Sequence, residues 1–427
     1  MQVEIGEKTL VYCAPVNEKT GQWGVYAIPR MWREPNGKLY VLVNGETDSP
    51  ILNAPDCPDL LFVSGDNGKT WREEKKFNLK EIKRLCGIDP PFCQLSDGRT
   101  VCIREKVGLT HVRDAEPKKR FSVFDGGEEV VTYRQGDLPK DAFGCERCVY
   151  DESGKLISID DVSIDFAERE IIVYDKIFAN GALKEQKSYV RSTIVASPYI
   201  NSVTEMQDGT LAGTCFGQNP EVSDRFCGET YFMTSKDGGK TWTKRTKITC
   251  NSEEYPFGLT GDGGESSLAL SPDGTLYCLT RTDMSIDHTV KGGKSDAMLF
   301  VSKDKGYTWS KGWTVADSSV TPHVLAFKGG VVVIVYGRPG VHIKVSTDGG
   351  KTFGKPLSII GKTLTEELSS GKSYMDAKYF DMDSYSNTFI EKLSENSFLI
   401  LYTDMKYDPG DGLRHKAGFV RKITINQ

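Results

Sequence analysis

The chain has no stretch close to the roughly 18 consecutive apolar residues of a membrane-spanning helix. Its first residues, Met1–Glu7, lack the basic start and the apolar run of a secretory signal. Long amphipathic helical patterns are also missing, and only residues 79–85 are compatible with a short helix. The formal net charge of -5 disfavours nucleic acid as a partner. We therefore expect little helix and a protein that binds neither a membrane nor nucleic acid.

The cysteines do not form a recognisable framework. There are 11 of them, an odd number, scattered along the sequence. Cys145 and Cys148 form a close pair, but no second pair completes a zinc site. We expect reduced, mostly buried thiols, no metal and no cofactor. This favours a cytoplasmic protein, or a secreted or periplasmic one if a leader has been removed.

One octapeptide pattern, Ser-x-Asp-x-Gly-x-Thr-Trp/Phe, occurs four times. Each copy follows a strand-like apolar run, and its Asp and Gly favour a tight turn because Asp bonds forward to backbone N–H groups and Gly adopts a positive φ. The final aromatic residue starts a return strand. A calcium loop is disfavoured, since each copy offers a single acidic residue. The four copies are Ser64–Trp71, Ser235–Trp242, Ser302–Trp309 and Ser346–Phe353.

A second repeat, a turn with Gly or its equivalent before an apolar strand, recurs every 55 to 66 residues. Four strands and their turns fill such a period, which is the size of a propeller blade. We expect one all-β domain over residues 1–427, a β-propeller of four-stranded antiparallel blades, with seven blades favoured over six. The expected blades are 22–75, 88–135, 143–190, 191–248, 257–313, 318–358 and 380–427.

The octapeptide is the Asp-box, and the sequence resembles the sialidase-like β-propellers whose repeat it is. The familiar sialidases have six blades. The resemblance implies a funnel at one end of the ring, built from residues near the open ends of the inner strands. It also implies the roles of the residues named next.

Glu265 and Arg281 match a sialidase stretch in which a glutamate begins one strand and an arginine ends the next, 16 residues later. A hairpin of this length brings its two ends together. In the family the glutamate polarises the nucleophile and the arginine holds the substrate carboxylate. Arg338, eight residues before Ser346, matches another substrate arginine. Arginine suits this task because its planar fork binds a carboxylate through two parallel hydrogen bonds.

Tyr385, in the segment 383–387, is similar to the tyrosine nucleophile of sialidases. A neighbouring carboxylate, here Glu265, would take the phenol proton, and arginines would stabilise the phenolate. Asn387 competes for the position, and Tyr374 and Tyr379 lie nearby in the sequence.

The first unit departs from the family, because Ala27 stands where sialidases carry an arginine. Arg30 lies three residues later, which on a regular strand is the opposite face, although a bulge could re-aim it. Arg104 could substitute. Only two of the family's three arginines are therefore matched, which weakens the case for sialic acid itself.

The family's general acid is an Asp in a loop after the first hairpin. Asp48 is our choice, with Glu46 second, because a loop carboxylate that loses water on substrate binding acquires the raised pKa of a general acid. Asp161, beside Asp160, could contact substrate hydroxyl groups.

His323 lies at the expected channel start of the sixth unit. It could contact substrate, or act as a base with Tyr385 as acid and Arg338 on a uronate, as in propeller lyases. A satisfied structural histidine is the plain alternative.

Three functions follow from these residues. The favoured one is an exo-acting, retaining glycoside hydrolase of sialidase type that cleaves a terminal acidic sugar from an oligosaccharide or glycoconjugate. The second is a hydrolase or polysaccharide lyase on a uronate-containing glycan. The third is a non-catalytic glycan-binding or assembly propeller, against which the expected Glu–Arg pair in the channel argues.

Overall fold

The computed structural model describes most of the chain. The described residues are 1–17, 20, 24–45, 57–77, 92–105, 119–122, 128–133, 145–165, 173–178, 189–190, 195–196, 200–218, 228–248, 265–282, 296–373 and 382–426. Nearly all of their regular structure is β, with one short α-helix, α2 (Leu364–Ser369), and one 3₁₀ turn, η3 (Lys328–Gly330). No helix in these ranges is long and apolar enough to cross a membrane.

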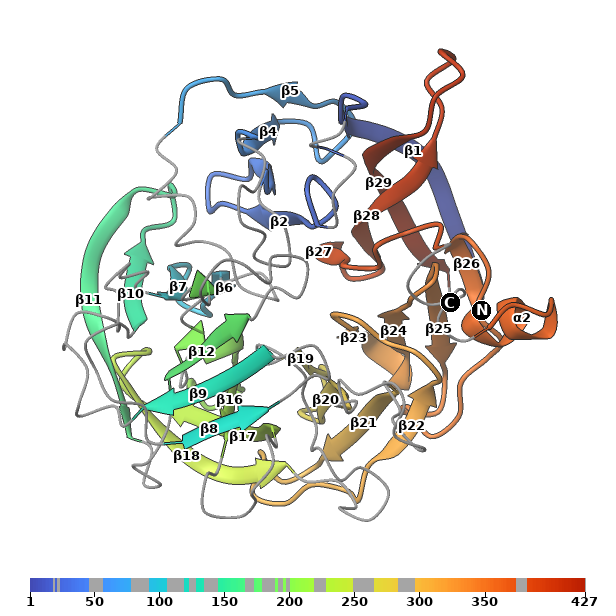
Figure 1. Cartoon of the computed structure of the whole chain (residues 1–427). Helices are drawn as coiled ribbons and strands as arrows, with labels where there is room; N and C mark the ends of the chain where they lie inside the picture. The colour runs from blue at the N-terminus through green and yellow to red at the C-terminus, as the bar shows by residue number, and fades with distance from the viewer. Residues whose placement is uncertain are drawn as a thin grey trace.

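The fold is a β-propeller whose sheets surround a common centre (Figure 1). Three sheets are regular four-stranded antiparallel meanders, in which each strand pairs with the next along the chain. The first comprises β2 (Pro29–Arg33), β3 (Leu39–Val43), β4 (Leu60–Ser64) and β5 (Arg72–Glu73). The second comprises β19 (Ser266–Leu270), β20 (Leu276–Arg281), β21 (Ala297–Ser302) and β22 (Trp313–Ala316). The third comprises β23 (His323–Ala326), β24 (Val332–Tyr336), β25 (Val341–Ser346) and β26 (Leu357–Ile360). In Figure 1 the first strands of these sheets, β2, β19 and β23, lie nearest the centre.

An eight-stranded sheet divides into two further four-stranded antiparallel units. One unit comprises β6 (Phe92–Gln94), β7 (Thr100–Glu105), β10 (Cys145–Tyr150) and β11 (Leu156–Asp165). The other comprises β15 (Ile200–Glu205), β16 (Leu211–Gln218), β17 (Gly228–Ser235) and β18 (Thr241–Ile248). The outer strands β11 and β18 join the two units through a short parallel pairing, from Ser163 opposite Thr241 to Asp165 opposite Thr243.

The ring is closed by a sheet that combines both ends of the described chain. Its order is β27 (Phe389–Ser394), β28 (Ser397–Tyr407), β29 (His415–Asn426) and β1 (Gln2–Cys13). β1 and β29 are antiparallel, with Gln2 opposite Asn426 and Cys13 opposite Ala417. The first strand of the sequence is therefore the outer strand of the last sheet.

The sheet pairing does not follow the expected blade boundaries at 88–135 and 143–190. Cys148 of β10 lies opposite Cys102 of β7, so strands from both ranges share one sheet. Other strands of the two ranges, β8 (Lys119–Ser122), β9 (Glu128–Tyr133) and β12 (Val173–Phe178), form a separate sheet with β13 (Tyr189–Val190) and β14 (Val195–Ala196). The described residues thus contain six four-stranded units plus this extra sheet, and the expectation of seven blades is not confirmed.

The expected blade boundaries differ from the observed ones because of the turn at Gly154. This turn joins β10 to β11, the third and fourth strands of their unit, which is the place that the octapeptide occupies in four other units. Asp151 accepts hydrogen bonds from the backbone N–H groups of Ser153 and Lys155 there. The sequence repeat at Gly154 therefore marks the outer hairpin of a blade that begins at β6, not a new blade.

The octapeptides form closed turns. In the first copy the Ser64 hydroxyl donates to Asp66 Oδ1 (2.8 Å) and accepts from the Gly68 N–H (2.9 Å). Asp66 also accepts from the Thr70 N–H (2.9 Å) and hydroxyl (2.6 Å). Serine-to-Asp and glycine-to-serine bonds of the same kind recur in the other three copies. The repeated residues of these loops satisfy the loops' own backbone groups, which is a structural role.

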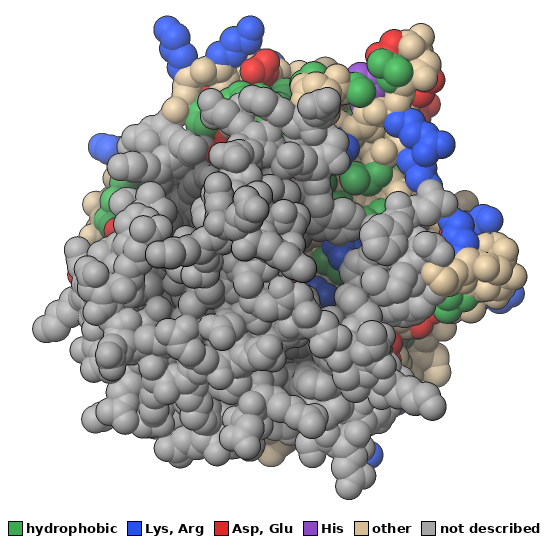
Figure 2. Space-filling model, in the orientation of Figure 1, with side chains coloured by type: hydrophobic (Ala, Val, Ile, Leu, Met, Phe, Trp, Pro, Cys, Tyr) green, Lys and Arg blue, Asp and Glu red, His purple; other side chains and the backbone are tan. Residues whose placement is uncertain are grey.

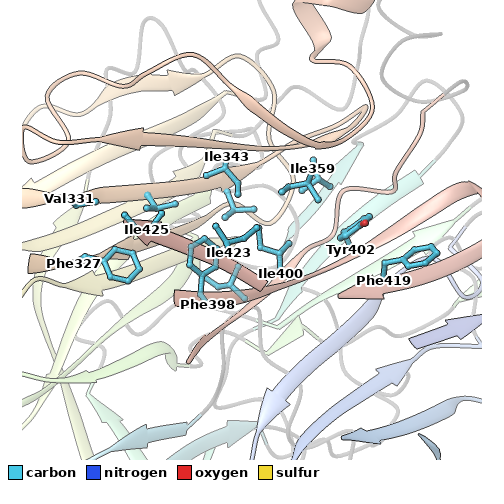
Figure 3. Packing of buried hydrophobic residues seen from close by; sticks show 14 of the residues in the cluster. Phe327, Val331, Ile343, Ile359, Phe398, Ile400, Tyr402, Phe419, Ile423 and Ile425 are labelled. Atoms are coloured by element: carbon cyan, nitrogen blue, oxygen red, sulfur yellow. The ribbon is translucent and has the colours of Figure 1, made fainter. Parts of the chain in front are cut away.

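Neighbouring sheets pack face to face through apolar side chains. Figure 3 shows Ile343 and Ile359 of the β23–β26 sheet against Phe398, Ile400 and Ile423 of the closing sheet. All five are buried, with at most 6% of each residue exposed. Each such side chain stabilises the fold by about 1.5 to 3 kcal/mol relative to an exposed one. This packing sets the angle between blades and so fixes where their inner strands begin.

Candidate functional site

The first two strands of one blade, β19 and β20, bring a carboxylate and a guanidinium together. Glu265 directly precedes β19 and Arg281 ends β20, and the Arg281 N–H donates to the Glu265 carbonyl oxygen (3.1 Å). Arg281 Nη1 lies 2.9 Å from Glu265 Oε1 and 3.0 Å from Oε2. The side chains are only 17% and 10% exposed, respectively. The hairpin that the sequence indicated therefore does place this pair at its open end.

The next blade reaches Glu265 through its backbone. The Thr321 N–H donates to Glu265 Oε2 at 2.9 Å. Thr321 Oγ1 in turn accepts from the Thr388 N–H at 3.2 Å. Thr388 immediately precedes β27, the inner strand of the closing sheet, and lies three residues after Tyr385. One chain of hydrogen bonds thus connects the beginnings of β19, β23 and β27.

His323 contributes to the same junction. Its ring is fully buried, and Nε2 lies 2.7 Å from the Thr388 carbonyl oxygen. A carbonyl oxygen only accepts, so Nε2 carries the proton. His323 therefore holds the start of β27 from the neighbouring blade, and this nitrogen cannot take up a proton as a general base.

Arg338 and Tyr385 lie against each other. Arg338 Nε and Nη2 donate to the Tyr385 carbonyl oxygen at 3.3 and 3.1 Å. The guanidinium carbon also lies 4.9 Å from the centre of the Tyr385 ring. Both residues are buried, with 8% and 1% of their surface exposed. The structure thus places a cation against the candidate nucleophile Tyr385. Tyr385 lies on the segment that is connected to Glu265 through Thr388 and Thr321.

Positive charge is visible on the face of the ring that Figure 2 shows. In the orientation of Figure 1, Lys or Arg side chains lie at the bottom of an opening near the middle of the face (Figure 2). Such charge in a hollow favours an anionic ligand.

Three other candidates are not brought to this junction by any described contact. Arg104 pairs with Glu146 of the adjacent strand β10 at 3.1 Å. Asp161 is exposed on β11, the outermost strand of its unit. With strands about 4.8 Å apart, it lies about 14 Å from the inner strand β6. Arg30 is half-buried on β2, opposite Leu42.

The general-acid candidates lie outside the described residues. Asp48 and Glu46 both fall there, as do Tyr374 and Tyr379. Ala27, at the position of the missing arginine, is fully buried in the turn before β2.

His342 is a buried ionisable group behind the Arg338 loop. Burial lowers the pKa of its imidazole to about 4. Nδ1 lies 3.0 Å from Ser358 Oγ, and the ring lies 5.6 Å from that of Tyr336. A Cβ atom on Gly340 would meet His342 Nε2 at 2.9 Å, so the ring packs directly under the loop. This histidine is neutral near pH 7 and supports the loop rather than exchanging protons.

Sequence reasoning missed Thr321 and Thr388, which link the blades. Thr321 has a left-handed backbone, with φ of 42°, which aims its N–H at Glu265. Residue type gives no signal for such a role because a backbone group performs it. Among the described residues, no group of three or more His, Cys, Asp or Glu could hold a metal ion.

Comparisons with known proteins agree with this architecture. The family model for the BNR repeat-like domain matches residues 192–376. The crystal structure of a protein of unknown function from Dyadobacter fermentans DSM 18053 matches with a TM-score of 0.55 at 16% identity, covering 99% of each chain. The Hadza microbial sialidase Hz136 matches with a TM-score of 0.51 at 13% identity, covering 94% of this chain and 66% of that one.

Likeness at such low identity shows the fold alone. The repeat match, the octapeptide turns and the ring of four-stranded sheets point to the same architecture. The chain therefore has a sialidase-like fold built on BNR repeats.

Proposed function

We propose that the protein is an exo-acting, retaining glycoside hydrolase of sialidase type that removes a terminal acidic sugar from a glycan. The observation that carries the proposal is the junction of Arg281, Glu265 and Thr321 with the Tyr385–Thr388 segment. A carboxylate, two guanidinium groups and a phenol come from three neighbouring blades. A non-catalytic scaffold has no need for such groups at one end of its strands.

In the proposed first step, Glu265 accepts the phenol proton of Tyr385, and the phenolate oxygen attacks the anomeric carbon of the sugar. The bond to the leaving oxygen breaks, and Asp48 protonates that oxygen. In the second step, Asp48 takes a proton from water, the water oxygen attacks the same carbon, and Tyr385 leaves and recovers its proton from Glu265. Two inversions give net retention, and a tyrosine that is neutral before the reaction does not repel an anionic sugar as the sugar binds.

The positive charges support an acidic substrate. Arg281 pairs with the carboxylate of Glu265. A guanidinium also recognises a sugar carboxylate through paired hydrogen bonds. Because Ala27 replaces the family's first arginine and is buried, a uronate is a second candidate for the terminal sugar. The lyase alternative is disfavoured, since His323 Nε2 donates its proton to Thr388 and the ring is fully buried.

The test compares chromogenic donors of sialic acid, uronic acids and neutral sugars, with ultraviolet absorbance as the measure of unsaturated lyase products. We expect release from an acidic donor, with the first-formed product keeping the anomeric configuration of the substrate by NMR. A fluorinated donor that stalls the intermediate should label Tyr385 in peptide mass spectrometry.

Tyr385→Phe should remove both the turnover and the label. Tyr307→Phe is the control, because Tyr307 is 61% exposed in an octapeptide turn at the other end of the strands. No turnover of any donor, with glycan binding retained, would instead favour the non-catalytic propeller.

A further inference from the structure

The side edge of the Arg338 guanidinium is directed at Tyr385. Nε and Nη2 form this edge, and both donate to the Tyr385 carbonyl oxygen. The same edge is one of the two through which an arginine binds a carboxylate with two parallel bonds. In this structure that edge binds a backbone carbonyl oxygen, while the guanidinium lies over the phenol ring of Tyr385.

The loop that carries Arg338 is hydrogen-bonded to the residues on both sides of Tyr385. The Ser384 N–H donates to the Pro339 carbonyl oxygen (3.1 Å), and the Ser386 hydroxyl donates to that of Gly340 (2.8 Å). The Ser318 hydroxyl donates to the Arg338 carbonyl oxygen (2.7 Å). These bonds hold the loop and the segment in one register.

The loop is also closely packed at its two glycines. A Cβ atom on Gly337 would lie 1.9 Å from the Gly340 carbonyl oxygen, and one on Gly340 would lie 2.4 Å from that of Ile360. On the other side of the segment, the Tyr385 N–H donates to Thr403 Oγ1 of β28 at 3.1 Å. Tyr385 is thereby held between β28 and the Arg338 loop.

We propose that Arg338 is a positioning residue that orients Tyr385 through its backbone and ring, rather than a ligand of the sugar carboxylate. The catalytic part of this inference rests on the proposed function, in which Tyr385 is the nucleophile. A cation over an aromatic face attracts the ring even when the phenol is neutral, and the attraction grows when water is excluded. When the phenol loses its proton, the same guanidinium faces a full negative charge, which low exposure leaves weakly screened. Under this proposal, Arg281 is the arginine that binds the sugar carboxylate.

The kinetic test is Arg338→Gln, compared on an acidic donor and on a neutral donor with the same leaving group. A displaced nucleophile lowers kcat by about 100-fold with KM little changed. We expect the same loss of kcat on both donors, and partial recovery in Arg338→Lys, which keeps the charge. A rise in KM confined to the acidic donor, with kcat unchanged, would show that Arg338 binds the carboxylate and overturn the inference.

Arg245→Gln is the matched control. Arg245 also covers a tyrosine, with its guanidinium carbon 4.5 Å from the Tyr307 ring centre, and also donates to a backbone carbonyl, that of Lys305 (2.7 Å). This pair lies at an octapeptide turn, so its loss should leave kcat and KM as in the parent.

A spectroscopic measurement separates the inference from the proposed function. The near-ultraviolet circular dichroism of a tyrosine reports how rigidly it is packed. We expect Arg338→Gln to remove the same circular dichroism signal that Tyr385→Phe removes. The double variant should then have the same spectrum as Tyr385→Phe alone. If the parent turns over no glycoside, the proposed function fails, but the spectrum still shows whether Arg338 orients Tyr385. A Tyr385 signal that persists in a folded Arg338→Gln variant would contradict the positioning role.

Discussion

Glu391 is a single residue whose ionisation should affect the whole ring. It lies on β27, and burial raises the pKa of its carboxyl to about 7 although Arg33 of β2, 3.6 Å away, acts in the opposite direction. The folded state therefore favours neutral Glu391. As pH rises from 4.5, its ordinary value, to about 7, the free energy of unfolding should fall. The fall should reach about 3 kcal/mol relative to Glu391→Gln.

Denaturant unfolding of parent and variant across this pH range measures the effect. Glu395→Gln is the control on the same hairpin. The Lys328 side chain lowers the pKa of the exposed Glu395, so its contribution is present above the ordinary value and is lost only at lower pH. Equal pH slopes in the parent and in Glu391→Gln would refute the prediction.

Glu265→Gln tests the candidate base. The amide oxygen can still accept from the Thr321 N–H, so the blades should stay joined while the group can no longer take the phenol proton. We expect kcat to fall by about 100- to 10,000-fold with little change in thermal stability. Glu205→Gln is the control, since Glu205 likewise accepts a backbone N–H, that of Ser96, from the neighbouring four-stranded unit. Equal activity in Glu265→Gln and the parent would exclude the proposed base.

At this scale the sequence predicted contacts within one hairpin and missed contacts between blades. Glu265 and Arg281 were predictable because a hairpin of fixed length brings its ends together. Thr321 and Thr388 were not, because they act through backbone groups whose direction depends on the packing of three sheets. Arg338 shows the same limit: spacing placed it in the expected funnel, but only the structure shows its contact with Tyr385.

The octapeptide turn is the element whose loss is simplest to predict. Asp66 accepts three hydrogen bonds within the turn, and these bonds lower the pKa of its carboxyl to about 2. Asp66→Ala should reduce the free energy of unfolding by about 2 kcal/mol near pH 7. The contribution of Asp66 should disappear as pH falls through its lowered pKa. Thermal unfolding measures this, with the exposed Lys69→Ala as the control in the same turn, and equal melting temperatures in the two variants would contradict it.

Sheet order was harder to predict than turns. Turn chemistry is local, so Asp151 and Gly154 signalled a hairpin correctly. A hairpin alone does not say whether its strands are the first and second or the third and fourth of a blade. Only the pairing of β10 with β7, across a long intervening stretch, settles this order.

At the scale of the whole molecule, the pairing of β1 with β29 closes the ring. Gly418 of β29 lies opposite Tyr12 of β1, and a Cβ atom there would meet the Tyr12 ring at 2.0 Å. The ring is buried, and its hydroxyl donates to the Tyr26 carbonyl oxygen at 2.9 Å. Gly418→Ala should therefore lower stability by roughly 1 to 3 kcal/mol.

Thermal unfolding of Gly418→Ala measures the strength of closure. Gly65→Ala is the control, since no atom lies within 4 Å of its added methyl group. Unchanged melting in both variants would show that β1 adjusts without loss and that closure tolerates a wider strand spacing.

The same closure imposes an order on synthesis. β1 is synthesised about 400 residues before its partner β29, which corresponds to roughly 20 to 80 s at typical rates of translation. Throughout that interval the nascent chain displays a bare strand of 12 residues, a template for association with other chains. Chaperone shielding of β1 during synthesis should thus raise the fraction of this protein that reaches its native state.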